Sequence, residues 1–393
     1  MRKLLILVCL LLTVAFACAA EKNASVREIT DFCRFSSSEN IRLTNVHDGH
    51  LLTTYSPKNG EQTIYITLPP QYVPAALTID MYRHMDTVRV SQYDAHGSAI
   101  PTGADEPEND FPFYRFYRLD SAAAMVSVTV PESTVISEIH VYPAGRLPDQ
   151  IQVWERTEKA DIMLISTHQD DEELWFGGLL PYYGVQEERS AIVVYMTDCG
   201  RNRITEALNG LWAMGLKQFP EFIGLPDFSG SYERSLDVWG GSDEIIGHMV
   251  RVIRQYRPEV IVTHDWDGEY GHNQHKLTAR HIELAVKAAA DPDMYPASAE
   301  RYGAWQTKKL YLHLSPVRPI EMNWDIPSAK LGGNTPYRLA EIGFSKHYSQ
   351  RGRYNMNKGR YYKNNAFGLV YTTVGEDVFK DDLLENTPAD LRR

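Results

Sequence analysis

The sequence predicts an α/β domain, with a Rossmann-like parallel sheet covered by helices on both faces, preceded by an all-β sandwich. Two patterns along the 393 residues indicate this order. Before about residue 150, short segments alternate in polarity or are rich in β-branched and aromatic residues, without a helical period. After about residue 158, near-continuous apolar strands alternate with segments of helical period, which is typical of parallel sheets buried on both faces.

Residues 1–20 are typical of a secretory signal peptide. Two basic residues precede the apolar run 4–17, which ends in small residues and is short for a membrane span. We therefore expect a secreted, periplasmic or cell-surface protein. Lipid anchoring at Cys18 is the less favoured alternative, because “AFAC” lacks a leucine-like residue three places before the cysteine. No other segment is long and apolar enough to span a membrane.

The composition excludes some classes of protein. The chain has 51 acidic and 40 basic residues and a formal net charge of −11. An acidic exported protein is a poor candidate for binding nucleic acid. Beyond the leader only Cys33 and Cys199 remain, and two distant cysteines do not make a disulfide-stapled fold. The oligomeric state is left open.

Residues 25–150 are predicted to form the sandwich. Short strands are expected in “QTIYITLP”, “ALTIDMY”, “TVRVSQYD”, “FYRFYRLD”, “MVSVTVP” and “ISEIHVY”. Turn-forming residues separate several of them, at the regular spacing of all-β sandwiches. The arrangement resembles discoidin-like, galactose-binding-like jelly rolls, whose closing strand is similar to “ISEIHVYPAG”.

Residues 158–317 are predicted to form the α/β domain, and residues 318–393 a less regular extension packed on it. Strands are expected at 160–167, 191–197, 221–227, 259–264 and 308–315, and helices at 172–183, 204–215, 244–256 and 275–290. The basic, tyrosine-containing segment 345–365 is read as a solvated surface. The alternative is a rim for an anionic or sugar-like ligand.

Two clusters of polar residues follow apolar strands, and ligands bind at the carboxyl ends of strands in such sheets. “HQDDE” places His168, Asp170 and Asp171 after the first strand. Adjacent carboxylates repel each other and need open water or a cation. In “YGHNQH”, His272 and His275 are three residues apart at a helix start and share a helix face.

Three side chains can bind one ion together: an imidazole and a carboxylate of the first cluster and an imidazole of the second. His168, Asp171 and His275 suit zinc and leave a position open for water. Zinc lowers the pKa of such a water to about 7. Asp170, next to a ligand, can then accept the proton of that water.

The motifs “HQDDE”, “RITE”, “GLPD” and “YGHNQH” occur in the order seen in the PIG-L (LmbE-like) de-N-acetylases. The resemblance covers roughly residues 161–315. It implies a Rossmann-like fold that uses a divalent ion, usually zinc, to hydrolyse N-acetyl groups on amino sugars and related compounds. Gln274 is a departure, because the family often has an aspartate there that influences the neighbouring histidines.

The resemblance also implies a role for each matching residue. The implied metal ligands are His168, Asp171 and His275; the implied catalytic residues are Asp170 as general base, His272 as acid or charge stabiliser, and Tyr270 on the acetyl oxygen; the implied substrate-side residues are Arg203 and Asp227.

The leading expectation is therefore an exported zinc-dependent deacetylase acting on an N-acetylglucosamine-type sugar, glycan or glycolipid. One alternative keeps the metal and hydrolyses another amide or a phosphoester. The other is a non-catalytic carbohydrate-binding surface protein. The sugar and its linkage are left open.

Several other residues are given structural readings. Helix-start acids are favoured by the helix dipole, so Glu172 and Glu173 are either ordinary helix-start residues or supports of the site. “DWDGE” is read as a polar loop. The residues read as core or structural are Trp175, Phe176, Cys199, His248, His281 and His313.

Overall fold

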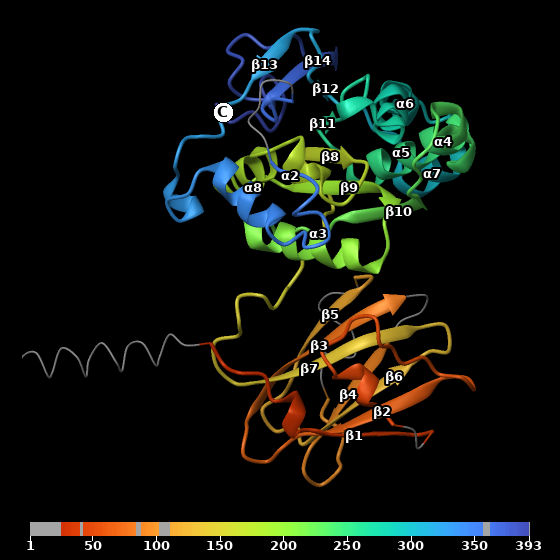
Figure 1. Ribbon diagram of the computed structural model, residues 1–393, viewed down its shortest axis with the longest axis vertical. Helices are drawn as coiled ribbons and strands as arrows, with labels where there is room; N and C mark the ends of the chain where they lie inside the picture. The colour runs from red at the N-terminus through yellow and green to blue at the C-terminus, as the bar shows by residue number, and fades with distance from the viewer. Residues whose placement is uncertain (1–24, 40–41, 84–87, 102–110, 357–361, 393) are drawn as a thin grey trace, which may run out of the picture. The chain divides into compact units, whose positions relative to one another are not determined.

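The computed structural model describes residues 25–39, 42–83, 88–101, 111–356 and 362–392. The predicted signal peptide, with Cys18, lies outside the described residues. The chain divides into two compact units, Met1–Val153 and Trp154–Arg393 (Figure 1). Among the described helices, none is both long and apolar enough to cross a membrane.

The first unit contains two antiparallel sheets. One has the order β1-β2-β6-β4 and the other the order β5-β3-β7. The strands are β1 (Arg34–Ser37), β2 (Gln62–Thr67), β3 (Pro74–Arg83), β4 (Arg89–Tyr93), β5 (Tyr114–Arg118), β6 (Met125–Val130) and β7 (Val135–Pro143), with short 3₁₀ turns η1 (Thr30–Phe32) and η2 (Thr44–Val46). Alternate residues of both sheets, such as Ile64, Val128, Ile79 and Val141, share one hydrophobic core. This arrangement is consistent with the predicted β-sandwich.

The second unit is built on a mixed seven-stranded sheet with the order β10-β9-β8-β11-β12-β14-β13. Its strands are β8 (Ile162–Ser166), β9 (Ala191–Asp198), β10 (Glu221–Pro226), β11 (Val260–Thr263), β12 (Lys309–His313), β13 (Pro319–Glu321) and β14 (Ala366–Thr372). The first five strands in this order are parallel. β14 pairs antiparallel with both β12 and β13.

The prediction of an all-parallel sheet is therefore wrong at one edge. β13 and β14 come from the predicted extension 318–393, where the sequence has no strand–helix alternation. An unpaired edge strand exposes a row of backbone donors and acceptors, and β14 satisfies that row on β12. The extension is thus part of the sheet.

The helices are α2 (Asp171–Leu174), α3 (Arg201–Met214), α4 (Tyr232–Val238), α5 (Ser242–Tyr256), α6 (Asn273–Ala290), α7 (Pro296–Tyr302) and α8 (Pro336–Phe344). Shorter turns are η4 (Pro181–Gln186, π-helical), η5 (Glu269–Gly271) and η6 (Ala329–Leu331). The predicted helix 172–183 is interrupted at residues 175–178, after which the chain is helical again. Gly177 has a positive φ of 49°, which is outside the right-handed helical region, and so the short helix cannot continue through it.

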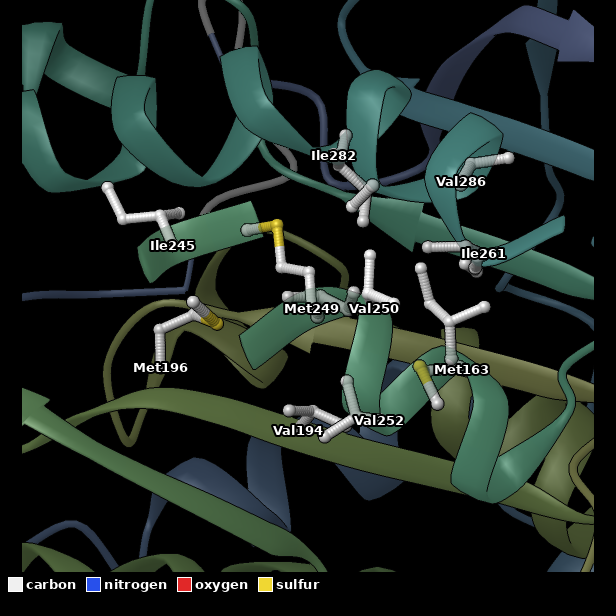
Figure 2. Packing of buried hydrophobic residues seen from close by; sticks show 14 of the residues in the cluster. Met163, Val194, Met196, Ile245, Met249, Val250, Val252, Ile261, Ile282 and Val286 are labelled. Carbon is white, nitrogen blue, oxygen red and sulfur yellow. The ribbon is translucent and has the colours of Figure 1, made fainter. Parts of the chain in front are cut away.

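Both faces of the sheet are buried, since every residue of β8 and β12 is buried. On one face, Met163 and Val194 pack with Met249 and Val250 of α5 and with Ile282 of α6 (Figure 2). On the other face, the Tyr195 ring stacks on Phe222 and its hydroxyl donates to Glu172 of α2. Burial of each large aliphatic side chain contributes about 1.5–3 kcal/mol, so this core holds the strand ends in a defined register.

Candidate active site

The two predicted motifs meet because their strands are neighbours. β8 and β11 pair in parallel, with Ile165 opposite Thr263. The chain leaves both strands at the same edge of the sheet, where ligands bind in open α/β sheets. There the backbone N–H of Thr167 donates to Nε2 of His264 over 2.9 Å and ties the two loops together.

Three of the predicted residues bring one donor atom each to a common point. Nδ1 of His168 lies 3.0 Å from Nε2 of His275 and 3.2 Å from Oδ2 of Asp171. Nε2 of His275 lies 3.3 Å from the same oxygen. Two ligands about 2.0–2.1 Å from a tetrahedral ion are about 3.3–3.4 Å apart. All three side chains are buried, so the triangle matches the edges of a tetrahedral zinc site in size and chemistry.

Hydrogen bonds decide which nitrogen of each histidine carries its proton. Nδ1 of His275 donates to Oε2 of Glu269 over 2.7 Å, which leaves the lone pair of Nε2 inside the triangle. Nε2 of His168 faces Oε1 of Gln274 at 3.1 Å and Oδ1 of Asp227 at 3.5 Å. Both are acceptors, so Nε2 carries the proton and Nδ1 presents its lone pair. Three lone pairs repel each other unless a metal cation or a proton lies among them. Burial lowers the pKa of both histidines, but Asp171 outweighs it and raises both, so the site favours positive charge.

Two hydrogen bonds to the backbone hold the side chain of Gln274. Its Nε2 donates to the carbonyl of Pro226, and its Oε1 accepts from the backbone N–H of Phe228. These two bonds orient the amide so that the oxygen faces His168. Gln274 therefore orients a predicted metal ligand and leaves His272 without a charged neighbour at that position.

The two adjacent aspartates have opposite electrostatics. Burial raises the pKa of Asp171, but the positive charge of His275 and His168 in their protonated forms outweighs burial and holds that pKa well below its usual range. Burial raises the pKa of Asp170 to about 7, even though the Arg203 guanidinium opposes the shift. Oδ1 of Asp170 lies 2.8 Å from Nη2 of Arg203. Asp171 is thus an anion at neutral pH, whereas the pKa of Asp170 lies near neutral pH.

Arg203 is held inside the protein. Besides Asp170, its Nε donates to the backbone carbonyl of Gln169 over 3.0 Å. The backbone of Asp170 has a φ of 143°, a conformation that L residues rarely adopt. Arg203 therefore holds a strained loop and its carboxylate, and its predicted contact with substrate stays a prediction.

His272 and Tyr270 lie beside the triangle. The His272 ring packs edge-on against His168, with centroids 4.7 Å apart, and its Nδ1 is buried without a hydrogen-bond partner among the described residues. Burial and the neighbouring rings of His275 and His168 lower the pKa of His272 to about 3. Tyr270 is 47% exposed, and its ring lies 5.6 Å from that of His272. Burial raises the pKa of its hydroxyl.

The structure brings together the predicted metal and catalytic residues, and Asp227 with them. Asp227 follows β10 and is about half exposed beside His168, whose hydrogen bond lowers the pKa of Asp227. Trp175, read from sequence as core, is part-buried and donates from Nε1 to Oδ1 of Asp171 over 2.8 Å. It therefore orients a carboxylate of the site.

Sequence reasoning missed a buried carboxylate. Glu269, placed in a polar loop from the sequence, is fully buried and lies 2.7 Å from Nδ1 of each of His264, His275 and His313. Burial raises the pKa of Glu269. The contacts with the three imidazoles outweigh burial and hold that pKa well below its usual range. A signal was available, since His264 follows β11 and His313 ends the neighbouring strand β12.

Sequence comparisons match part of this chain to known proteins. Residues 163–287 match the family model described as PIG-L, GlcNAc-PI de-N-acetylase. A 1D-myo-inositol 2-acetamido-2-deoxy-alpha-D-glucopyranoside deacetylase of Geodermatophilus obscurus is 29% identical over 46% of this chain and 70% of the relative. A relative with the same activity in its name, from Catenulispora acidiphila, is 26% identical over 43% of this chain and 59% of the relative.

Solved structures were compared as well. An N,N'-diacetylchitobiose deacetylase from Pyrococcus horikoshii aligns with 49% of this chain and 71% of its own, at 18% identity and a TM-score of 0.38. The family match, residues 163–287, falls within the unit that holds the triangle. The second unit of this chain therefore carries a PIG-L family domain.

Proposed function

We propose that this protein is an exported metal-dependent de-N-acetylase that removes the acetyl group from an N-acetylglucosamine-type sugar. The observation that carries the proposal is the convergence of three lone pairs, from His168, Asp171 and His275, beside the buried carboxyl of Asp170. The names of the relatives support the substrate class. The parallel strand order β10-β9-β8-β11-β12 supports a Rossmann-like description of the domain.

His168, Asp171 and His275 are the residues that would hold zinc. Two neutral imidazoles and one carboxylate are a usual catalytic set, and the tautomers deduced above leave the required lone pairs available. A zinc ion bound there would act as a Lewis acid that polarises the acetyl carbonyl and lowers the pKa of the attacking water.

Asp170 is the proposed general base. A base works best when its pKa is near the working pH, and burial places the pKa of Asp170 at about 7. Arg203 holds its Oδ1, which fixes the direction of the carboxylate. The proton that Asp170 accepts from water is then available for the departing amine.

His272 and Tyr270 are the proposed oxyanion donors. A histidine with a pKa of about 3 is neutral at pH 7. His272 can therefore donate one hydrogen bond, but it is not protonated and cannot act as a general acid from its resting state. The raised pKa of Tyr270 keeps its hydroxyl protonated and able to donate. This favours charge stabilisation over amine protonation as the role of His272.

The test is release of acetate from N-acetylated sugars by the purified chain. We expect release that stops after chelation and returns with added zinc. Release of phosphate from phosphoesters, without acetate, would support the alternative hydrolase. Binding of sugars without turnover would support the carbohydrate-binding alternative, and the galactose-binding-like sandwich would then carry the function.

A further inference from the structure

A second group of buried acidic and imidazole side chains lies on the other side of α2. Glu172 and Glu173 belong to α2, and His347 follows α8 by three residues. Their exposed fractions are 1%, 0% and 0%. One potential ligand atom from each lies within 4.8 Å of the others. Nε2 of His347 is 3.4 Å from Oε2 of Glu173 and 3.8 Å from Oε1 of Glu172.

Hydrogen bonding does not account for this group. Neither ring nitrogen of His347 has a hydrogen-bond partner within the described residues, and the carboxyl of Glu173 has none apart from the neighbouring carboxyl of Glu172. Buried polar groups almost always have a partner, and an unpartnered buried carboxylate is strongly unfavourable. Such atoms gathered in one place indicate that a proton or a cation, which no described residue supplies, lies among them.

Arg203, whose charge acts on His347, is already engaged. Its guanidinium contacts Asp170 and the carbonyl of Gln169. Glu172 is also partly engaged, since it accepts from the Tyr195 hydroxyl and, over 2.9 Å, from the backbone N–H of Asp170. Among the described residues, two carboxylates therefore face one imidazole with no matching positive side chain. Either protons or a metal cation must offset their charge.

Glycines in two neighbouring helices leave room for the side chain of Glu173. A Cβ on Gly210 of α3 would lie 3.0 Å from Oε1 of Glu173, and one on Gly343 of α8 would lie 2.9 Å from it. These glycines let two helices approach while leaving the carboxylate its space. The same close approach brings His347 near, because Nε2 of His347 would lie 3.1 Å from the Gly210 Cβ.

The segment that carries His347 is also fixed in place. Glu206 of α3 accepts from the backbone N–H of Ser349 over 2.8 Å and from its hydroxyl over 2.7 Å. The His347 ring stacks on Phe344, with centroids 5.9 Å apart. The donors thus come from α2 and from a segment that is held against α3 and α8.

We propose that Glu172, Glu173 and His347 bind a second divalent transition-metal ion of the zinc class. One imidazole nitrogen and two carboxylate oxygens are ligands that zinc accepts. The ion links α2, which begins with Asp171, to the C-terminal segment after α8. Its role is structural, because complete burial leaves no access for a substrate. This site stands on its own observations and does not depend on the proposed deacetylase activity.

The experiment counts zinc ions on the full-length protein. Protein refolded with excess Zn²⁺, then freed of loose metal, is measured by native mass spectrometry and elemental analysis. We expect two zinc ions per wild-type chain, and one in Glu173→Gln and in His347→Gln. His275→Ala should also retain one, because it removes only the site of the proposed function. His281→Gln, a buried histidine bonded to Leu277 and Ser242, is the matched control and should keep two.

Location is settled by anomalous diffraction of wild-type crystals at the zinc edge, which requires no variant to fold. A peak among Glu172, Glu173 and His347 supports the site. Wild-type protein with zinc at the His275 site alone overturns it. A Glu173→Gln variant with unchanged zinc content and a raised Tm also overturns it, because the carboxyl would then be shown to hold a proton.

Discussion

Two neighbouring aspartates separate metal binding from proton transfer at the scale of single residues. Asp170→Asn keeps the shape of the side chain but cannot accept a proton, and loss of a general base typically lowers the rate about 10²–10⁴-fold. We expect kcat for acetate release to fall by this factor while zinc content is unchanged. Asp171→Asn should instead lower zinc affinity, with activity partly restored by excess zinc. The opposite pattern in the two variants would exchange their roles.

Tyr270 tests the oxyanion assignment. It is 47% exposed and has a positive φ of 46°, so its side chain is not part of the core. Tyr270→Phe removes only the hydroxyl, and loss of one oxyanion donor typically lowers kcat about 10²–10³-fold. Zinc content and Tm should not change. A variant with wild-type kcat would remove Tyr270 from the mechanism, and one that loses zinc would make it a support of the metal ligands.

Glu269 tests whether a buried carboxylate tunes the metal ligands. Glu269→Gln places an NH₂ group against one of three imidazole N–H groups, which should disturb the tautomer of His275. Partners that orient a metal-binding histidine are typically worth about 10–100-fold in metal affinity. Competition with a chromophoric chelator measures this. Glu259→Gln is the matched control, because Glu259 is buried and paired with Lys159 at the start of β11. If Glu269→Gln and Glu259→Gln both bind zinc with the affinity of the wild type, the role of Glu269 is purely structural.

At the scale of elements, the last two strands decide where the domain ends. Removing residues 316–393 deletes β13 and β14 and exposes the edge of β12. It also removes Asp377, the partner of the fully buried Lys309. An unpaired buried charge typically costs about 3–5 kcal/mol, a large part of the stability of a domain. We expect residues 154–315 to be insoluble and residues 154–393 to be soluble. A folded short form, shown by a cooperative thermal transition, would contradict this.

At the scale of the whole molecule, every predicted site residue lies in the second unit. A protein starting at Trp154 should therefore fold, bind zinc and deacetylate a small soluble sugar with a kcat within about twofold of the full chain, because the units have separate cores. Activity on polymeric substrates should fall if the sandwich binds glycans. An inactive but folded and metal-loaded second unit would show that residues 25–150 contribute to the site.

The sequence by itself predicted the order of the strands and of the site motifs along the α/β domain. Each of the five strands expected in the α/β domain has a counterpart, from β8 to β12. Apolar runs and helical periods are local properties, so they can be read without a structure. The same holds for the two motifs, since residues that follow parallel strands must reach one edge of the sheet.

Only the tertiary structure decided which groups face each other. Three contacts of this kind join residues that are far apart in the sequence. Glu269 and His313 are 44 positions apart, Gln274 and His168 are 106 apart, and His347 and Glu173 are 174 apart. The antiparallel pairing of β14 likewise depends on where a long irregular segment returns. Such contacts arise from packing of whole elements, in which burial removes water and leaves each polar group only the partners that the fold supplies. Local pattern places His264 and His313 at the ends of neighbouring strands but does not identify the group that each of them faces.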